Sequence, residues 1–505
     1  MKRYELYKKL KSGTDIRGVA VETEGSPVQL DDLTVFDLTC GFCQWLINNG
    51  VKPSSNIAVG HDSRISAERI KKQVISAICS YNFNVFDCSL ASTPAMFMTT
   101  VDLDCVAAVQ ITASHHPYDR NGLKFFTTEG GLNSEDLDKV IENTRELIIP
   151  LHKAFTIEKV DFMSVYAKSL REMVCREVNA KVYDKPLLGY KIVVDAGNGV
   201  GGFYATEVLE KLGADISGSQ FLEPDGMFPN HAPNPENKEA MRSISEATLK
   251  NHADLGVIFD TDVDRASCVD DSGNEINRNR LVALASIIAL EGNAGGTIVT
   301  DSVTSTGLTD FIENELGGVH YRYKRGYRNV INEQIRLNNE GVNCPLAIET
   351  SGHAAFRENY YLDDGAYLIT KIVIKMAQMG KNGKKLETLI KNLKDPLEAV
   401  ELRLKIGEED FRSYGNKVIS DLEEYSASKG GWTISPDNRE GIRVFLDEDH
   451  GNGWFLLRLS VHDPIMPLNI ESDSKGGAQL IALEILEFLE KYPALDSKVV
   501  ADFIG

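Results

Sequence analysis

Three aspartates at alternate positions form the group of side chains in this chain that is best suited to chemistry. Asp260, Asp262 and Asp264 follow the apolar run 256–259, and Arg265 comes directly after them. At the end of a strand, three such carboxylates can point at one place, where a hard divalent cation relieves their mutual repulsion. The spacing indicates a Mg²⁺ site, and the fixed charge of Arg265 favours a metal that acts on a phosphoryl group. Taken alone, an Asp-rich turn is more often a solvated loop, so this interpretation needs support from the rest of the chain.

A serine and a lysine offer a second chemistry earlier in the chain. The segment 105–110 is predicted to be a buried strand, and it leads into a polar loop that contains Ser114. Lys124 lies on the following strand, after Gly122, which lets the chain turn back so that the ammonium can approach the serine. A hydroxyl is a poor nucleophile unless a charge or a base activates it. The structural alternatives are an ordinary loop serine and a solvated strand lysine.

The segment 347–353 is a third apolar strand that runs into a polar turn. Alternate residues of an extended chain share a side, so Glu349, Ser351 and His353 are predicted to lie together. These side chains can accept and donate hydrogen bonds to neighbouring hydroxyls, as recognition of a sugar requires. The alternative is a capped helix start in which the backbone satisfies His353.

Two further segments are suited to binding phosphate. Arg458 and Ser460 share one face of a predicted strand end, and with free amides in the next turn they can hold a phosphate dianion. The basic turn 324–328 ends in Arg328 at the start of a predicted helix, where an anion is favoured. An edge-strand arginine without a ligand is the alternative for Arg458.

Two shorter motifs are interpreted as structural. The run 197–202 fits the G-x-G-x-x-G pattern of dinucleotide-binding folds, but Asp195 would repel a pyrophosphate there. We interpret its glycines as close packing at a strand–helix corner. Cys40 and Cys43 form a C-x-x-C motif with helical spacing and no partner pair, so we expect the eight cysteines to be reduced core residues.

Composition narrows the class of protein. The chain has 505 residues, 42% of them hydrophobic, which is enough for several independent cores. A net charge of -20 and the lack of a Lys/Arg-rich run argue against nucleic-acid binding. The N-terminus lacks the apolar stretch of a signal peptide, and the apolar segments are too short to cross a bilayer. We therefore expect a cytoplasmic protein without a membrane partner.

Three stretches repeat the order of strand, polar turn and amphipathic helix, beginning near residues 57, 191 and 297. Alternation of this kind predicts α/β layers around a largely parallel sheet. Beyond residue 396 the pattern changes to alternating strands closed by a helix. We predict an α/β protein with three related α/β/α sandwich domains plus a smaller C-terminal α+β domain, with the bounds 1–165, 166–280, 281–395 and 396–505.

The polar segments resemble, in order, the motifs of the α-D-phosphohexomutase family, and the resemblance covers almost the whole chain. Runs similar to its phosphoserine, metal, sugar and phosphate loops lie at 112–117, 260–265, 349–353 and 458–464, with supporting matches at 12–18 and 233–237. One such motif alone is only moderately specific, whereas the ordered set is strong evidence.

The resemblance implies an isomerase of the phosphoglucomutase/phosphomannomutase kind, with its domains around a central cleft. Ser114 would carry a phosphoryl group against Mg²⁺, held by Ser114, Asp260, Asp262 and Asp264, and would pass it to a hexose phosphate. The bisphosphorylated sugar then turns over without leaving, and its other phosphate returns to the serine. A sugar 1,6-bisphosphate is the implied activator, and a small phosphosugar is the implied partner of a monomer or homodimer.

The same resemblance distributes the remaining roles. Lys124, Arg17 and His353 would move the hydroxyl proton and stabilise the transition state. The implied substrate-binding residues are Arg265, Arg328, Glu349, Ser351, Arg458 and Ser460.

A few positions depart from the family pattern. His462 and Asp463 stand where the phosphate loop usually has a threonine and then a glutamate or another small polar residue, and His116 replaces a frequent asparagine. We hypothesise that protonated His462 donates to the phosphate, which would make substrate affinity depend on pH near neutrality. Glu440 stands before Gly441 where relatives commonly have aspartate, and no consequence follows from the sequence.

Two other functions fit part of the pattern. In a phosphatase of the haloacid-dehalogenase type, Asp260 would be the nucleophile and Asp262 the acid/base, but Asp264 and the mid-chain position of the motif are unusual for that class. A catalytically silent sugar-phosphate sensor would keep the loops and lose turnover. The choice between glucose, mannose and another hexose stays open, because no residue can be assigned to the 2-hydroxyl.

Overall fold

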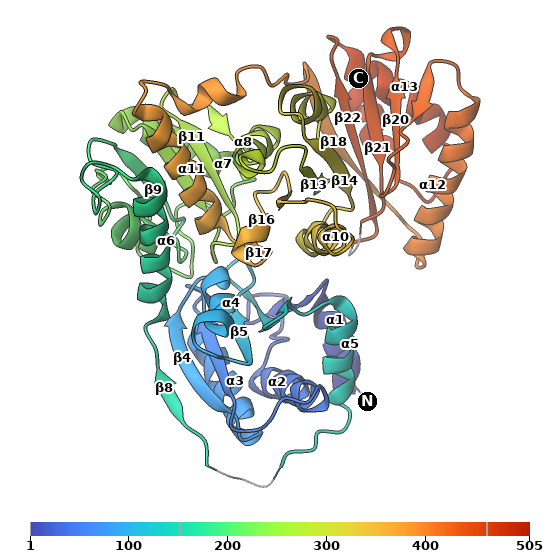
Figure 1. Ribbon diagram of the computed structural model, residues 1–505. Coiled ribbons are helices and arrows are strands. Elements are labelled where there is room, and N and C mark those ends of the chain that lie inside the picture. Colours follow the sequence, from blue (N-terminus) through green and yellow to red (C-terminus); the bar gives the residue numbers. More distant parts are fainter. Residues whose placement is uncertain (1, 151–153, 461–462) are drawn as a thin grey trace. The chain divides into compact units, whose positions relative to one another are not determined.

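The computed structural model describes residues 2–150, 154–460 and 463–505 (Figure 1). The chain divides into two compact units. The first consists of Met1–Glu291 and Ser351–Lys391, and the second of Gly292–Thr350 and Asn392–Gly505.

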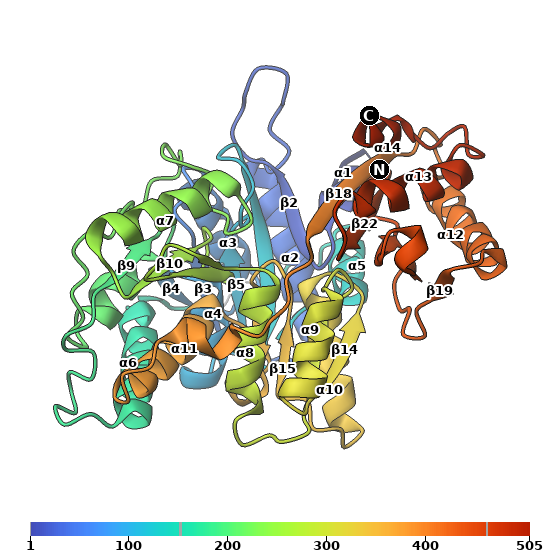
Figure 2. The same ribbon diagram turned by 90° about the horizontal axis from the view of Figure 1, so that it is seen from above.

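An eight-stranded sheet forms the N-terminal part of the first unit, drawn in blue to teal in Figures 1 and 2. Its strands follow in the order β1 (Lys11–Ser12), β2 (Asp15–Val19), β6 (Arg120–Thr127), β5 (Ala107–Ile111), β3 (Asn56–His61), β4 (Asn84–Leu90) and β8 (Ile157–Lys159), with β7 (Gly130–Gly131) beside β6. Strands β5, β3, β4 and β8 pair in parallel, and β6 joins β5 and β2 antiparallel. The chain therefore reverses between β5 and β6, at the loop that contains Ser114.

Five helices belong to this sheet: α1 (Lys2–Leu10), α2 (Asp32–Asn48), α3 (Ala67–Ser80), α4 (Thr93–Asp102) and α5 (Ser134–Asn143). Apolar side chains of α2, α3 and α5 form one buried core with the strands, for example Phe42, Val74 and Val140. Helix ends follow local sequence signals, since the side chains of Asp31 and Ser92 accept from backbone amides at the starts of α2 and α4.

A smaller sheet carries the acidic turn 260–265, also within the first unit. It has the order β12 (Glu275–Ile276), β11 (Ala266–Asp270), β10 (Leu255–Phe259) and β9 (Ile192–Asp195), and only β9 and β10 are parallel. The associated elements are α6 (Phe162–Val178), a π-helix at Tyr204–Leu209, α7 (Lys238–Asn251), α8 (Asn279–Leu290), the hairpin β16 (Ala354–Phe356) and β17 (Leu362–Asp363) around a 3₁₀ turn at Arg357–Asn359, α11 (Gly365–Gly380) and a 3₁₀ turn at Leu386–Ile390. The β10–β11 connection is the turn 260–265.

The second unit begins with a parallel arrangement. Strand β13 (Thr297–Asp301) pairs in parallel with β14 (Val319–Tyr323) and with β15 (Leu346–Ile348). Its helical segments are α9 (Thr306–Asp310), a π-helix at Phe311–Glu315 and α10 (Tyr327–Asn339).

The C-terminal part of the second unit, orange to red in Figure 1, is an antiparallel sheet with helices. Its order is β18 (Glu398–Lys405), β22 (Ile465–Ser472), β21 (Gly453–Leu457), β20 (Ile442–Leu446) and β19 (Trp432–Ile434). The accompanying helices are α12 (Phe411–Ser428), a 3₁₀ turn at Glu448–His450, α13 (Gly477–Leu489) and α14 (Lys498–Ile504). Side chains from α12 and α13, such as Leu422 and Ile485, are buried in one core with the strands.

These elements agree with the predicted fold class. The first three sheets mix parallel strands with helices, and the C-terminal sheet is antiparallel, as an α+β domain requires. All eight cysteines are buried and none is in a disulfide, which confirms the expectation of reduced core residues. Among the described residues, no helix combines the length and the apolar character needed to cross a membrane.

Candidate functional site

The acidic turn 260–265 follows β10, whose five residues are all buried. Asp260, Asp262 and Asp264 are themselves no more than 1% exposed. Each offers a ligand atom, and these three atoms lie within 4.8 Å of one another. Three carboxylates in so small a buried volume repel one another unless positive charge compensates them.

Ser114 lies against this cluster. Its hydroxyl donates to Asp260 Oδ2 at 3.0 Å, and Arg265 Nη2 lies 3.2 Å from the same hydroxyl oxygen. The Arg265 Nε donates to Asp260 Oδ2 at 3.2 Å, so one guanidinium contacts both the serine and its carboxylate partner. The structure thus brings together two loops that are 146 residues apart in sequence.

Lys124 supplies positive charge from β6. Its ammonium donates to Asp264 and lies 3.4 Å from Asp262 Oδ2, and its side chain is 4% exposed. Thr93, at the start of α4, donates to Asp262 Oδ2 at 2.5 Å. The lysine partly neutralises two of the three carboxylates, and the threonine hydroxyl fixes the orientation of one of them.

The carboxylates of this cluster differ in their electrostatics. Burial and the charges of Asp264 and Asp262 raise the pKa of Asp260 well above its usual value. Burial also disfavours the charged form of Asp264, but the charges of Lys124, His353 and Arg265 together outweigh it and hold the pKa of Asp264 well below its usual value. Of the three carboxylates, Asp260 is therefore the one that needs additional positive charge nearby in order to be ionised.

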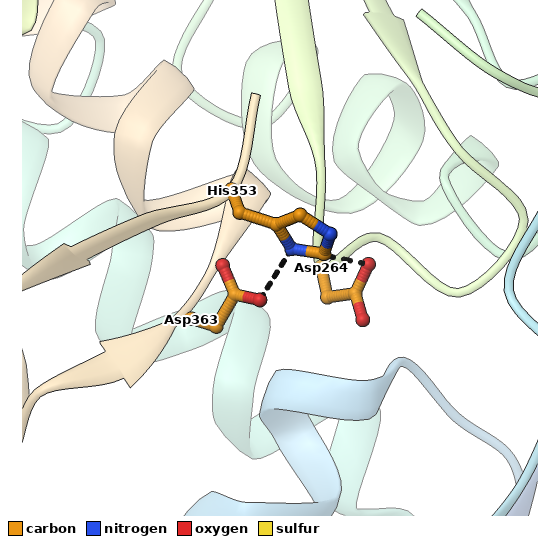
Figure 3. Close-up of side chains that lie close together, drawn as sticks. All are labelled: Asp264, His353 and Asp363. Carbon is orange, nitrogen blue, oxygen red and sulfur yellow. Dashed lines mark hydrogen bonds and ion pairs between the residues drawn. The ribbon is translucent and has the colours of Figure 1, made fainter. Parts of the chain in front are cut away.

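His353 faces Asp363 and Asp264, the last aspartate of the acidic turn, as Figure 3 shows. It precedes β16, and its Nδ1 lies 2.5 Å from Asp363 Oδ2 and 4.0 Å from Asp264 Oδ1. Burial opposes protonation of this imidazole, but Asp363 and Asp264 together raise the pKa of His353 to about 9. The side chain is consequently a proton donor at neutral pH.

Two residues of these loops have an unusual backbone conformation. Ser114 has a φ of 50°, and the β-branched Val263 has a φ of 66°. Positive φ is uncommon for residues other than glycine and is a genuine outlier for a β-branched one. Such conformations persist where the surrounding contacts hold them, and they concentrate at functional sites.

Arg64 holds the serine loop in place. Its guanidinium donates to the carbonyls of Ser114 and His116, and also to those of Pro117 at 2.7 Å and Arg120 at 2.9 Å. Its Nε donates to Asp62 at 3.1 Å, and both side chains are fully buried. Sequence reasoning missed this residue, although its position just after a strand in an Asp-x-Arg turn was a usable signal.

We expect Arg64→Lys to lower the free energy of unfolding by roughly 3 kcal/mol, the scale of breaking a buried charged network. A single ammonium cannot reach four carbonyls and a carboxylate at once. Urea denaturation followed by circular dichroism measures the change. The exposed α6 residue Arg176 provides the matched control, Arg176→Lys, and equal stability of the two variants would contradict the scaffold role.

The glycine-rich run 197–202 packs as predicted. A Cβ atom on Gly199 would lie 2.6 Å from the carbonyl oxygen of Thr261, and one on Gly202 would lie 2.2 Å from that of Leu222. The Val200 amide donates to the same Thr261 oxygen at 2.8 Å. The run therefore packs directly on the acidic turn 260–265, and the interpretation of its glycines as close packing is confirmed.

Arg17 lies on β2, where it pairs with Asp15 at 2.8 Å. Burial, followed by the charges of Arg17 and Arg120, lowers the pKa of His116 to about 3. Arg17 is thus close enough to act electrostatically on the serine loop. Its strand is hydrogen-bonded to β6, which also carries Lys124.

The cluster has the chemistry of a divalent cation site. Asp262 Oδ1 and Asp264 Oδ1 are buried and accept no hydrogen bond from any described residue. Buried carboxylate oxygens are normally satisfied, so two such atoms beside a third carboxylate fit a hard cation that prefers oxygen ligands. Asp260, Asp262, Asp264 and Ser114 are the residues that would hold it.

The predicted phosphate-binding residues lie in the second unit. Arg458 is 8% exposed, and its Nε makes no hydrogen bond to any described residue. Ser460 Oγ accepts from the Asp463 amide at 3.3 Å, whereas His462 lies outside the described residues. Arg328 belongs to the first turn of α10.

The segment 349–353, which is predicted to bind the sugar, divides between the two units after residue 350. In the second unit, Glu349 Oε1 accepts from the Gly326 amide at 2.6 Å, which ties this carboxylate to the basic turn. In the first unit, Ser351 is 6% exposed, and its hydroxyl has no hydrogen-bond partner among the described residues. Asp363, which orients His353, is a further residue that sequence reasoning missed.

Comparison with known proteins identifies the family. Models of the phosphoglucomutase/phosphomannomutase α/β/α domains I, II and III match residues 8–148, 164–273 and 277–396. The phosphomannomutase/phosphoglucomutase of Pseudomonas syringae pv. tomato is 29% identical over 84% of this chain and 85% of its own length. The phosphoglucomutase/phosphomannomutase of Thermococcus kodakarensis is 30% identical over 84% of this chain and 87% of its own.

A solved structure extends this likeness to the fold. The crystal structure of a phosphoglucomutase/phosphomannomutase family protein from Burkholderia thailandensis has a TM-score of 0.80 at 24% identity. It covers 97% of this chain, and this chain covers 99% of it. The haloacid-dehalogenase alternative finds no support in these matches. The chain belongs to the phosphoglucomutase/phosphomannomutase family.

Proposed function

We propose that the chain interconverts the 1-phosphate and 6-phosphate of a hexose, glucose or mannose or both, through a phosphorylated Ser114 and a bisphosphorylated sugar. The observation that carries this proposal is the 3.0 Å contact between Ser114 Oγ and Asp260 Oδ2 inside a cluster of three buried carboxylates. A phosphoserine at this place would need strong positive charge around it, and Arg265 lies within hydrogen-bonding distance.

A Mg²⁺ ion bound by Asp260, Asp262 and Asp264 would neutralise charge on the transferring phosphoryl group. Arg265 neutralises the same region from the protein side, since its guanidinium already contacts the serine hydroxyl. Lys124 holds the carboxylates in their orientation through its contacts with Asp262 and Asp264. In this proposal it also moves the proton of the sugar hydroxyl.

His353 acts as the second proton-transferring group, held in its protonated form by Asp363 and Asp264. Arg17 stabilises negative charge that develops beside the serine loop. Glu349 and Ser351 bind sugar hydroxyls, and the phosphate that is not transferred is bound by Arg328, Arg458 and Ser460.

We also propose that these residues belong to four domains with the bounds 1–165, 166–280, 281–395 and 396–505.

The ligands follow from the same proposal. The substrate is a small phosphosugar, the metal is Mg²⁺ and a sugar 1,6-bisphosphate restores the phosphoserine when the intermediate escapes. We further propose a cytoplasmic enzyme that is a monomer or a homodimer.

A coupled assay of the purified protein tests the function. Glucose 1-phosphate, mannose 1-phosphate and glucosamine 1-phosphate are each supplied with Mg²⁺ and a trace of the sugar bisphosphate. Turnover of glucose or mannose 1-phosphate supports the proposal, whereas tight binding without turnover would support a sugar-phosphate sensor instead.

The pH dependence tests the role of Asp363. Its carboxylate raises the pKa of His353 above the ordinary value, so the protonated form is favoured until the pH rises through about 9. Asp363→Asn removes that charge and should move the alkaline limb of kcat towards about 7, which lowers kcat about tenfold at pH 8. An unmoved alkaline limb in Asp363→Asn, with the exposed Asp184→Asn as the matched control, would refute this role.

A further inference from the structure

Glu440 lies in the turn between β19 and β20, in the C-terminal part of the second unit. Its Oε2 accepts from the Ser302 hydroxyl at 2.5 Å and from the Arg325 amide at 3.1 Å. Ser302 directly follows β13, and Arg325 lies two residues after β14. One carboxylate therefore ties the C-terminal sheet to the ends of two strands of the preceding sheet.

Neighbouring residues of the same turn strengthen this connection. Arg439 donates to the Arg322 carbonyl at 3.1 Å and stacks on the Tyr321 ring with its guanidinium carbon 3.8 Å from the ring centre. Arg443, at the start of β20, donates to the Thr304 carbonyl at 2.9 Å. The turn is thus anchored at several points, which fixes where the Glu440 charge lies.

That charge lies beside the proposed phosphate site. Gly441 has a φ of 57°, and a Cβ atom there would lie 2.8 Å from the Arg458 Cα, so the turn packs directly on the arginine backbone. Burial lowers the pKa of Arg458, and Glu440 is the strongest of the carboxylates that oppose this effect. Glu440 is therefore a close electrostatic neighbour of Arg458.

Other carboxylates nearby also act on the arginines. Arg325 lies 4.0 Å from Asp301 and 3.8 Å from Glu401, and both carboxylates also act on Arg458. Glu401 is in addition paired with Arg403 at 2.8 Å. Asp301 is fully buried and accepts from Thr350, so it is committed to the fold, whereas Glu440 is half-buried and nearer to the turn surface.

We propose that Glu440 is a positioning residue of the phosphate site, which places the basic turn and at the same time limits how tightly Arg458 holds a phosphate dianion. The inference rests on the proposed function, in which the bisphosphorylated sugar has to release its bound phosphate before it can turn round. A site that bound the dianion with its full arginine charge would slow that step, because stronger binding appears mainly as slower dissociation.

Loss of an ordinary binding residue weakens the binding of phosphate, whereas loss of the Glu440 charge is expected to tighten it. Glu440→Gln keeps an oxygen that can accept from Arg325 or Ser302 and removes only the charge. It should tighten the binding of a phosphate ester about tenfold at low salt, and the gain should shrink at 0.5 M salt, where charges are screened within about 4 Å. In the active enzyme it should lower both KM and kcat.

The test uses full-length Ser114→Ala protein, so that binding is measured without turnover. Isothermal titration with glucose 1-phosphate and with inorganic phosphate compares Glu440→Gln with Glu440→Asp, which keeps the charge. A matched control is Glu448→Gln, which removes an exposed charge from the same part of the unit. We expect Kd to fall about tenfold only in Glu440→Gln, with the other two variants within about twofold of the parent.

Unchanged or weaker binding in Glu440→Gln, an equal gain in Glu448→Gln, or no measurable phosphate-ester binding to any variant would overturn the inference. Failure of the proposed function looks different. A wild-type protein that binds phosphate esters but does not isomerise them would refute the mutase, and the comparison of Kd values would still decide the role of Glu440.

Discussion

Ser114→Ala is expected to lower kcat at least about 10⁴-fold, because no other side chain can take over the role of a covalent phosphoryl carrier. The neighbouring hydroxyls are committed to other carboxylates, since Thr112 donates to Asp62 at 2.7 Å and Thr93 donates to Asp262. The variant should retain substrate binding, since the arginines and Lys124 are unchanged. A coupled assay measures kcat, and intact-mass analysis after incubation with sugar bisphosphate measures phosphoserine.

The phosphoryl linkage gives an independent control for this prediction. Phosphoserine survives hydroxylamine, whereas an acyl phosphate on an aspartate is cleaved by it. Ser217→Ala, at an exposed loop serine of the same unit, should retain full activity. Residual activity of Ser114→Ala above a few per cent, or a phosphoenzyme that hydroxylamine removes, would contradict the role of Ser114.

Asp260→Asn is expected to lower the activity of the enzyme and to raise the thermal stability of the metal-free protein. Removing a metal-binding carboxylate should lower kcat about 10³-fold, equivalent to roughly 4 kcal/mol of lost transition-state stabilisation. In metal-free protein the same change should raise Tm by roughly 2 °C or more, because burial and two like charges disfavour the charged form of Asp260. Thermal denaturation with and without Mg²⁺ measures both effects.

The sign of the stability effect depends on pH. A carboxyl whose folded pKa is raised contributes its stability at low pH and loses it as the pH rises through the folded value. The advantage of Asp260→Asn should therefore be largest at neutral pH and shrink towards pH 4. The variant should also lose the rise in Tm that Mg²⁺ gives the parent. A metal-free Tm below that of the control Asp184→Asn, or an undiminished response to Mg²⁺, would count against the assigned site.

The sequence predicted those parts of the site that depend on strand ends. Asp260 and Ser114 each follow an apolar strand, and polar side chains at such ends are easy to recognise. Their convergence at 3.0 Å could be expected only from the family resemblance, because spacing alone does not tell which strand ends meet. The same holds for Lys124, whose position in β6 was predicted but whose partners were not.

The supporting residues could not be predicted because their role depends on distant partners. Arg64 reaches four carbonyls that lie 50 to 56 residues further along the chain, and no local pattern encodes that contact. Asp363 sits in an acidic pair before α11 that equally suits an ordinary helix start. Val263 shows the clearest disagreement between residue type and structure, since β-branched residues avoid the left-handed conformation that it adopts here.

The most direct test of the central claim is diffraction from crystals of the phosphorylated protein soaked in Mn²⁺, which substitutes for Mg²⁺ and gives an anomalous signal. We predict a single strong anomalous peak bound by Asp260, Asp262 and Asp264, with an oxygen of phosphorylated Ser114 completing the coordination. A peak elsewhere in the chain, or none at this cluster under saturating Mn²⁺, would contradict the assignment of the serine and the three aspartates to one metal site.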